Sequence, residues 1–155
     1  MFTLFKKKSD EAKTLGQQGE LFAQEEYKRQ GYKIIARNEY NKKGKQLGEI
    51  DFIATDKKKI VFVEVKTRTA GIDKFGKGVE SVNVFKQRKI LLAVKMYLLR
   101  HPEHRDLQPQ IDVCLIESNP QTTIKNNPAS KPVFNGFDKR FKPAIIISNV
   151  VEDFN

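Results

Sequence analysis

Two acidic residues and a lysine stand where a pair of neighbouring strands would bring them together. Asp51 lies in the run Gly-Glu-Ile-Asp-Phe-Ile-Ala-Thr, and Glu64 and Lys66 lie in the run Ile-Val-Phe-Val-Glu-Val-Lys-Thr-Arg. Both runs are rich in β-branched and aromatic residues, and the short lysine-rich connection between them is typical of a tight turn between antiparallel strands. The sequence therefore predicts a hairpin over residues 48–68.

The register of this hairpin follows from a symmetric closure of its turn. Such a closure gives four facing pairs: Thr55–Ile60, Ile53–Phe62, Asp51–Glu64 and Glu49–Lys66. Because side chains alternate between faces, one face carries only apolar residues: Ile50, Phe52, Ala54, Val61, Val63 and Val65. The other face is apolar near the turn and charged at the open end. A strand that is apolar on both sides is typical of the middle of a sheet, so we expect these charges beside a core.

The facing carboxylates of Asp51 and Glu64 favour a bound cation. Like charges placed opposite each other on neighbouring strands are destabilising, and an all-oxygen site suits a hard cation such as Mg²⁺ or Mn²⁺. The carbonyl of Val65 is a candidate third ligand. Lys66 points to the same side as Glu64, where it could position or deprotonate a water molecule or offset charge developing on a phosphate.

An ordinary surface hairpin would explain the same charges more simply. Glu49 and Lys66 could form a cross-strand ion pair, with Asp51 and Glu64 solvated at a sheet edge. For an arbitrary hairpin that explanation is the more common one. Here, however, Glu64 and Lys66 interrupt an apolar run at alternate positions and meet an acid on the partner strand. This context favours the metal site.

The rest of the chain supplies helices and further strands. Apolar residues at helical spacing predict a helix over 14–30 that stops at Gly31, and a second over 83–100 that Asn83 caps and Pro102 closes. Strands are expected over 32–38, 110–117 and 144–151. The core stripe of the second helix is predicted to be Phe85, Lys89, Leu92, Ala93, Met96 and Leu99.

A length of 155 residues predicts one domain with a real core, here 14–155, after a loosely ordered basic segment over 1–13. Loops are expected over 39–47, 69–78 and 118–143, the last as a long surface excursion. The single cysteine, Cys114, lies in an apolar run, which favours a buried thiol and a reducing cytoplasm. No apolar run approaches the ~20 residues of a membrane span.

The formal net charge of +10 predicts a polyanionic partner. We find no basic amphipathic helix with apolar anchors, so nucleic acid is favoured over a membrane surface. Lys86 and Gln87 lie in the first turn of the second helix, where free amide groups favour an anion. Further candidate contacts to phosphate are Arg68, Lys89 and Lys45, although exposed lysines are often only solvated.

The two histidines, His101 and His104, lie in a polar segment at the end of the second helix. The sequence shows no partner residues that would suggest a zinc site there.

Asp51 and the segment Glu64-Val65-Lys66 resemble the bipartite motif of the PD-(D/E)XK nuclease superfamily. A larger set resembles the YraN-like family, usually described as Holliday-junction-resolvase-like: Gly16, Gly19-Glu20, Asn38, Gly48-Glu49-Ile50-Asp51, Phe62-Val63-Glu64-Val65-Lys66-Thr67-Arg68, Phe75-Gly76, Lys86 and Tyr97-Leu98. The short motif is weak by itself, but the combined string is specific. The resemblance extends roughly from Leu15 to Ile116.

This resemblance implies an α/β protein of the restriction-endonuclease-like fold, with a central mixed β-sheet flanked by α-helices. It implies Mg²⁺-dependent hydrolysis of phosphodiester bonds in DNA, including branched intermediates of repair or recombination, and a metal-site role for Glu20 on the first helix. Symmetric cutting of two strands would suggest a homodimer. The chain departs from the family at residues 110–113, where Gln-Ile-Asp-Val replaces the usual Arg-Phe-Asp-Val.

Two other function classes remain open. A nucleic-acid-binding protein could keep the nuclease-like fold without turnover, and the basic charge fits that function equally well. An RNA-binding protein is less favoured, because the chain lacks strands with paired aromatic residues for base stacking.

Overall fold

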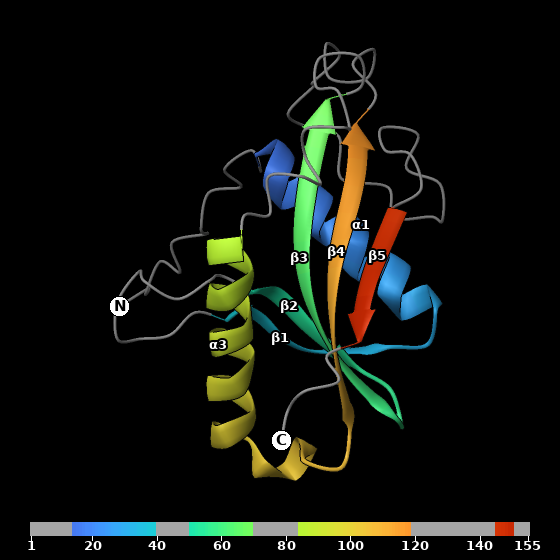
Figure 1. Ribbon diagram of the computed structural model, residues 1–155. Helices are drawn as coiled ribbons and strands as arrows, with labels where there is room; N and C mark the ends of the chain where they lie inside the picture. The colour runs from blue at the N-terminus through green and yellow to red at the C-terminus, as the bar shows by residue number, and fades with distance from the viewer. Residues whose placement is uncertain (1–13, 40–49, 70–83, 119–144, 151–155) are drawn as a thin grey trace, which may run out of the picture.

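The five strands of the described part of the chain form one mixed sheet in the order β1-β2-β3-β4-β5 (Figure 1). The computed structural model describes residues 14–39, 50–69, 84–118 and 145–150. Its elements are α1 (Leu15–Arg29), β1 (Lys33–Glu39), β2 (Ile50–Thr55), β3 (Lys59–Thr69), α3 (Val84–Arg100), the short 3₁₀-helix η1 (Pro102–His104), β4 (Gln108–Ser118) and β5 (Ile145–Val150). Only β3 and β4 pair in parallel; the other neighbours are antiparallel. The predicted α/β class with a mixed sheet and flanking helices is confirmed.

The first helix begins and ends as the sequence predicts. The side chain of Thr14 accepts the N–H of Gln17, and the side chain of Gln17 accepts the N–H of Thr14, which closes a capping box. At the other end Gly31 has a φ of 93°, a conformation that glycine adopts at little cost. The chain can therefore reverse directly into β1.

The central hairpin has the predicted register near its turn, where Thr55 pairs with Ile60 and Ile53 pairs with Phe62. The predicted pair Asp51–Glu64 is not part of the observed register, which ends at Phe52–Val63, and Glu49 lies outside the described residues. The turn is closed by Asp56, whose Oδ1 accepts the backbone N–H groups of Lys58 and Lys59, each at 2.7 Å. These hydrogen bonds lower the pKa of the Asp56 carboxyl. Beyond the hairpin, β4 continues the sheet beside the whole length of β3.

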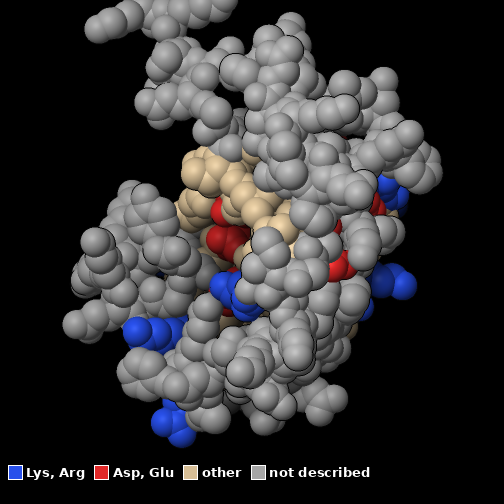
Figure 2. All heavy atoms as spheres, turned by 90° about the horizontal axis from the view of Figure 1, so that it is seen from above, with Lys and Arg blue, Asp and Glu red and all other residues tan. Residues whose placement is uncertain are grey.

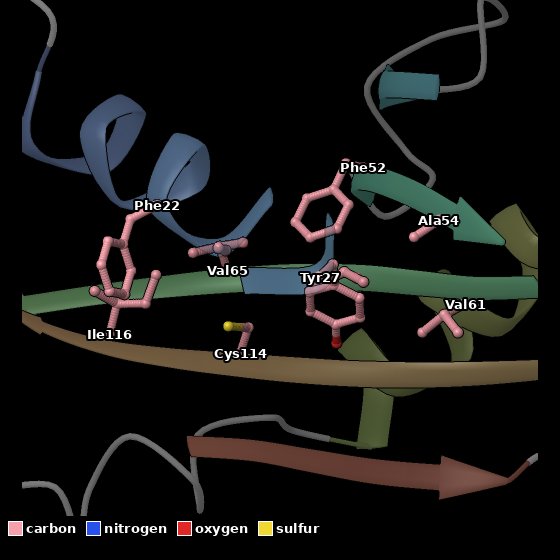
Figure 3. Packing of buried hydrophobic residues seen from close by; sticks show 10 residues of the cluster. Phe22, Tyr27, Phe52, Ala54, Val61, Val65, Cys114 and Ile116 are labelled. Carbon is pink, nitrogen blue, oxygen red and sulfur yellow. The ribbon is translucent and has the colours of Figure 1, made fainter. Parts of the chain in front are cut away.

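Two hydrophobic cores lie on opposite faces of the sheet, so the interior strands are covered on both sides as predicted. Figure 3 shows the core under α1, where buried side chains of the helix meet β2, β3 and β4. It contains Phe22, Ala23, Tyr27, Phe52, Ala54, Val61, Val63, Val65, Cys114 and Ile116. The second core packs α3 on the other face and contains Ile50, Ile53, Ile60, Phe62, Ile90, Ala93, Val94 and Tyr97.

The predicted core stripe of α3 is wrong at two positions. Leu92 and Leu99 are 46% and 78% exposed. Ala93 is buried as predicted, together with Ile90, Val94 and Tyr97, which the prediction left out. Apolar residues lie on almost every side of this helix, so spacing alone favours two adjacent stripes about equally. The packing against Phe62 and Ile53 decides between them.

Ile50 is the second correction. It belongs to the core under α3, whereas strict alternation along β2 placed it with Phe52 under α1. The change lies beside an irregularity of the neighbouring strand, where Asn38 of β1 has a φ of 50° between the pairs Arg37–Phe52 and Glu39–Ile50. A left-handed residue interrupts the regular pleat, and asparagine tolerates that conformation better than most residues.

Cys114 is fully buried, as predicted, and burial raises its thiol pKa to about 12. No described helix has the length and apolar content needed to cross a bilayer. The predicted basic lead-in over 1–13, the proposed cap Asn83 and nearly all residues of the three predicted loops lie outside the described residues.

Candidate metal site on the central strands

Asp51 lies where the regular pairing of β2 with β3 ends. That pairing runs from Thr55–Ile60 to Phe52–Val63, and Asp51 is the next residue of β2. Its Oδ2 atom accepts the backbone N–H of Val65 at 2.6 Å. A side-chain carboxylate thus takes the place of a backbone acceptor, which holds Asp51 against the part of β3 that carries Glu64 and Lys66.

Glu64 is a buried acid with a cation beside it. The residue is only 7% exposed, and its Oε1 forms an ion pair with the Nζ of Lys66, whose side chain is 32% exposed. Burying a charge is costly unless a partner compensates it, so the site requires positive charge. Glu49, the predicted partner of Lys66, lies outside the described residues; the observed partner is Glu64.

The residues around Glu64 fit a hard divalent cation. The carboxylates of Asp51 and Glu64 and the carbonyl of Val65 offer oxygen atoms only, as Mg²⁺ and Mn²⁺ prefer. The hydrogen bond from Val65 to Asp51 joins two of these residues, and the third, Glu64, precedes Val65 on β3.

Glu20 lies on α1, the helix that packs closely against β3. A Cβ atom on Gly19 would lie 1.9 Å from the Oγ1 of Thr67, so only glycine lets α1 come this close to β3. Glu20 is the next residue of α1 after Gly19. Within the described residues, however, Glu20 does not form a group with Asp51 and Glu64 in which all three donor atoms lie within 4.8 Å.

The candidate phosphate contacts are only partly described. Arg68 lies two residues after Lys66 on β3, on the same face of the strand. Arg68 is half-buried, as is Lys89 on α3. Lys86 and Gln87 lie in the first turn of α3, but their side chains are outside the description, and Lys45 lies outside it entirely. Figure 2 views the molecule toward the C-terminal ends of β3 and β4, and shows acidic side chains at this end with basic side chains next to them.

A buried polar network that the sequence did not predict links α1 to β4. The hydroxyl of Tyr27 donates to Asp112 Oδ2 at 2.5 Å, and the Nε2 of Gln110 donates to Asp112 Oδ1 at 2.8 Å. Lys59 then donates to Gln110 Oε1 at 3.1 Å. Burial, together with the hydrogen bond to Asp112, raises the pKa of Tyr27. The available signal was an aspartate inside the apolar run of β4.

A second unpredicted group lies at the end of α3. Donor atoms of His101, Glu103 and His104 all lie within 4.8 Å of one another, and they form the one such three-residue group in the described part of the chain. The sequence suggested no partner for these histidines. The sequence analysis did not predict the turn of η1. This turn brings His101, Glu103 and His104 to one side.

Comparison with known proteins places these residues in a family context. The sequence profile described as Uncharacterised protein family UPF0102 matches residues 19–116, a range that includes Glu20, Asp51, Glu64 and Lys66. A UPF0102 protein of Caldanaerobacter subterraneus subsp. tengcongensis is 39% identical over 109 residues, which cover 70% of this chain and 84% of the relative.

Two more relatives carry the same description. A UPF0102 protein of Clostridium botulinum strain 657 is 38% identical over 125 residues, which cover 81% of this chain and 94% of the relative. A UPF0102 protein of Chlorobium limicola is 43% identical over 103 residues, which cover 66% of this chain and 74% of the relative.

Proposed function

The chain belongs to the UPF0102 family, and we propose that it is a Mg²⁺- or Mn²⁺-dependent endonuclease that hydrolyses phosphodiester bonds in DNA. One observation carries the proposal. The Asp51 side chain binds the backbone of Val65 at the end of the β2–β3 pairing, and Val65 lies between the buried Glu64 and its ion-pair partner Lys66. Asp51 of β2 is thus joined to the stretch of β3 that carries a second acid and a lysine.

In this proposal Asp51, Glu64 and the Val65 carbonyl hold the metal, and Glu20 supplies an outer or second-metal ligand. The bound cation would polarise a phosphate oxygen and favour ionisation of the attacking water. The N–H of Val65 orients the Asp51 carboxylate through a hydrogen bond. Lys66 would orient the water or stabilise the charge that grows on the phosphate. Its ammonium group is already held at the site through Glu64.

The proposed substrate is DNA, because the net charge of +10 favours a polyanion. We propose contacts to backbone phosphate from Arg68, Lys86, Gln87, Lys89 and Lys45. Branched DNA is the proposed preferred form, with a homodimer cutting its two strands in the cytoplasm, and no membrane is involved.

A cleavage panel tests the enzyme hypothesis. Purified protein should cut at least one of branched, flap, nicked, linear duplex or single-stranded DNA when Mg²⁺ or Mn²⁺ is added, and chelation should stop the reaction. Asp51→Asn should remove cleavage, whereas Asp106→Asn, which changes an exposed acid in the turn after η1, should not. If the wild type cuts none of these substrates with either metal, the enzyme hypothesis fails.

A non-catalytic nucleic-acid-binding protein is the second candidate. The ion pair between Lys66 and Glu64 favours it, because this pair compensates the buried acid without any metal. Calorimetric titration with Mn²⁺ separates the two candidates. A nuclease should bind Mn²⁺ in the wild type and lose that binding in Asp51→Asn, while a pure binder should retain DNA affinity with no Mn²⁺ site to lose.

A further inference from the structure

Both histidines of the chain lie in one turn after α3. The sequence contains only His101 and His104, and Glu103 stands between them on η1. The Nδ1 of His101 lies 2.9 Å from Glu103 Oε1, and the Nε2 of His104 lies 3.9 Å from the same oxygen. Two imidazoles and a carboxylate therefore converge on one point at the surface.

The turn is held by the backbone and by the core. Pro102 begins η1, the N–H of His104 donates to His101 O at 3.1 Å, and the N–H of Leu107 donates to His104 O at 3.1 Å. The Tyr97 ring, which is 4% exposed, stacks on His101 with centroids 4.2 Å apart and lies parallel to His104 at 6.2 Å. The imidazole rings are thus oriented before any ligand binds, which lowers the entropy lost on binding.

We propose that His101, Glu103 and His104 form a three-ligand site for a borderline divalent transition metal of the Zn²⁺ and Co²⁺ class. Imidazole nitrogen and carboxylate oxygen suit these ions, and a site with three protein ligands leaves a fourth position for water or an external ligand. Bonds of about 2.1 Å in tetrahedral geometry place ligand atoms about 3.4 Å apart. The observed separations of 2.9 and 3.9 Å lie on either side of that value.

Metal binding would require one tautomer of His101. His101 Nδ1 and Glu103 Oε1 share a hydrogen bond. To ligate through Nδ1, His101 must carry its proton on Nε2 instead, so binding exchanges this hydrogen bond for two bonds to the metal. The side chains of His101, Glu103 and His104 are 37%, 58% and 19% exposed, which leaves access for the ion.

This site is separate from the one on β2 and β3. It lies before β4, whose first residue Gln108 pairs with Lys59 at the start of β3, whereas Glu64 pairs with Val113 farther along. Figure 1 shows η1 at the opposite end of the sheet from the C-terminal ends of β3 and β4. The ligand chemistry also differs, since one site offers nitrogen and the other offers oxygen only. The proposed metal site at η1 therefore does not depend on nuclease activity.

Titration of the full-length protein in an Asp51→Asn background tests the site without interference from the central strands. Calorimetry with Zn²⁺ should show one saturable equivalent, and Co²⁺ should give the visible absorption of a site with nitrogen ligands. Both imidazole signals in the proton NMR spectrum should shift on addition of Zn²⁺. His104→Gln and Glu103→Gln should each weaken Zn²⁺ binding at least about tenfold, since even changes to outer-shell partners have effects of this size.

Asp106→Asn is the matched control, because it removes an exposed carboxylate two residues beyond the site and should leave Zn²⁺ affinity unchanged. Glu103→Gln keeps the test valid if His104→Gln disturbs packing on Tyr97, since Glu103 is the most exposed of the three ligands. The proposal is overturned if Zn²⁺ fails to saturate, or if Glu103→Gln binds it as tightly as its parent. The His101–Glu103 contact would then be an ordinary surface ion pair.

Discussion

The Oδ2 atom of Asp51 accepts the backbone N–H of Val65 at 2.6 Å, across the point where β2 and β3 stop pairing regularly. Asp51 therefore has two separable roles, one as an acceptor for β3 and one as a candidate metal ligand. Each role depends on a different property of the side chain, because the hydrogen bond needs an oxygen and the metal needs a negative charge.

Asp51→Ala should destabilise the fold by about 1–3 kcal/mol, because it leaves a partly buried N–H without its acceptor. Asp51→Asn keeps an oxygen in place and should retain most of this stability. Both variants should lose Mn²⁺ binding. Urea unfolding measures the first effect and calorimetry the second. If Asp51→Asn binds Mn²⁺ like the wild type, Asp51 is structural only.

Lys66→Ala should reduce turnover far more than DNA affinity, as expected for an interaction made mainly in the transition state. A loss of about 10²–10³ in kcat would match the removal of one charge-stabilising donor. Lys89→Ala is the contrasting variant, because a contact to phosphate should weaken binding and flatten the slope of log K against log salt by about 0.9. Single-turnover rates and affinities at several salt concentrations measure both. An unchanged rate on bound DNA in Lys66→Ala would assign Lys66 to binding.

Gly19→Ala should destabilise the protein by about 1–3 kcal/mol, because the new methyl group would lie 1.9 Å from Thr67 Oγ1 and α1 would have to move away from β3. Gly16→Ala is the matched control. Its Cβ would meet nothing closer than Thr14 Oγ1 at 4.0 Å, so the helix propensity of alanine should instead stabilise the protein by up to about 1 kcal/mol.

The expected clash in Gly19→Ala can be tested further with a double variant. Thr67→Ala removes the opposing hydroxyl, so combining it with Gly19→Ala should recover part of the lost stability. Chemical unfolding of the four proteins in the cycle gives the coupling energy. Additive effects would mean that the helix shifts for another reason.

Tyr27→Phe should cost about 1.5–3 kcal/mol of stability, because it removes the donor that Tyr27 supplies to the buried carboxylate of Asp112.

The contribution of Tyr27 to stability should also depend on pH, with a definite sign. Burial raises the pKa of Tyr27 in the folded protein, so this stabilisation is complete below the unfolded pKa near 10 and declines as the pH rises above it. Tyr32 has a pKa raised in the same direction, so Tyr27→Phe should reduce the alkaline loss of stability without abolishing it. Unfolding measured between pH 8 and 11 tests this.

The sequence predicted a structural feature correctly where the residues of one element determine that feature. The register of the hairpin follows from its own turn, and α1 follows from Thr14 and Gly31 at its two ends. The buried face of α3 cannot be predicted from α3 alone. Leu92 and Val94 are both apolar, and only packing against the sheet selects Val94 for the core. Ile50 was misplaced because the left-handed conformation of Asn38 lies on a different strand.

The candidate site was predictable in part for the same reason. Glu64 and Lys66 lie on one strand, so alternation alone puts them on one face, and their ion pair is observed. The hydrogen bond from Val65 to Asp51 depends on where two strands separate, which no local pattern encodes. The link between Tyr27 and Asp112 joins residues 85 positions apart, and only the packed structure brings them together.

The parallel pairing of β3 with β4 has a consequence for how the chain folds. Lys59 pairs with Gln108 and Thr69 with Ser118, so each of these contacts joins residues about fifty positions apart and requires a large loop to close. The hairpin of β2 and β3 can form early from local contacts. Until β4 docks, the long apolar strand β3 is an open edge that can pair with another chain. Docking of β4 is therefore the step that covers this edge.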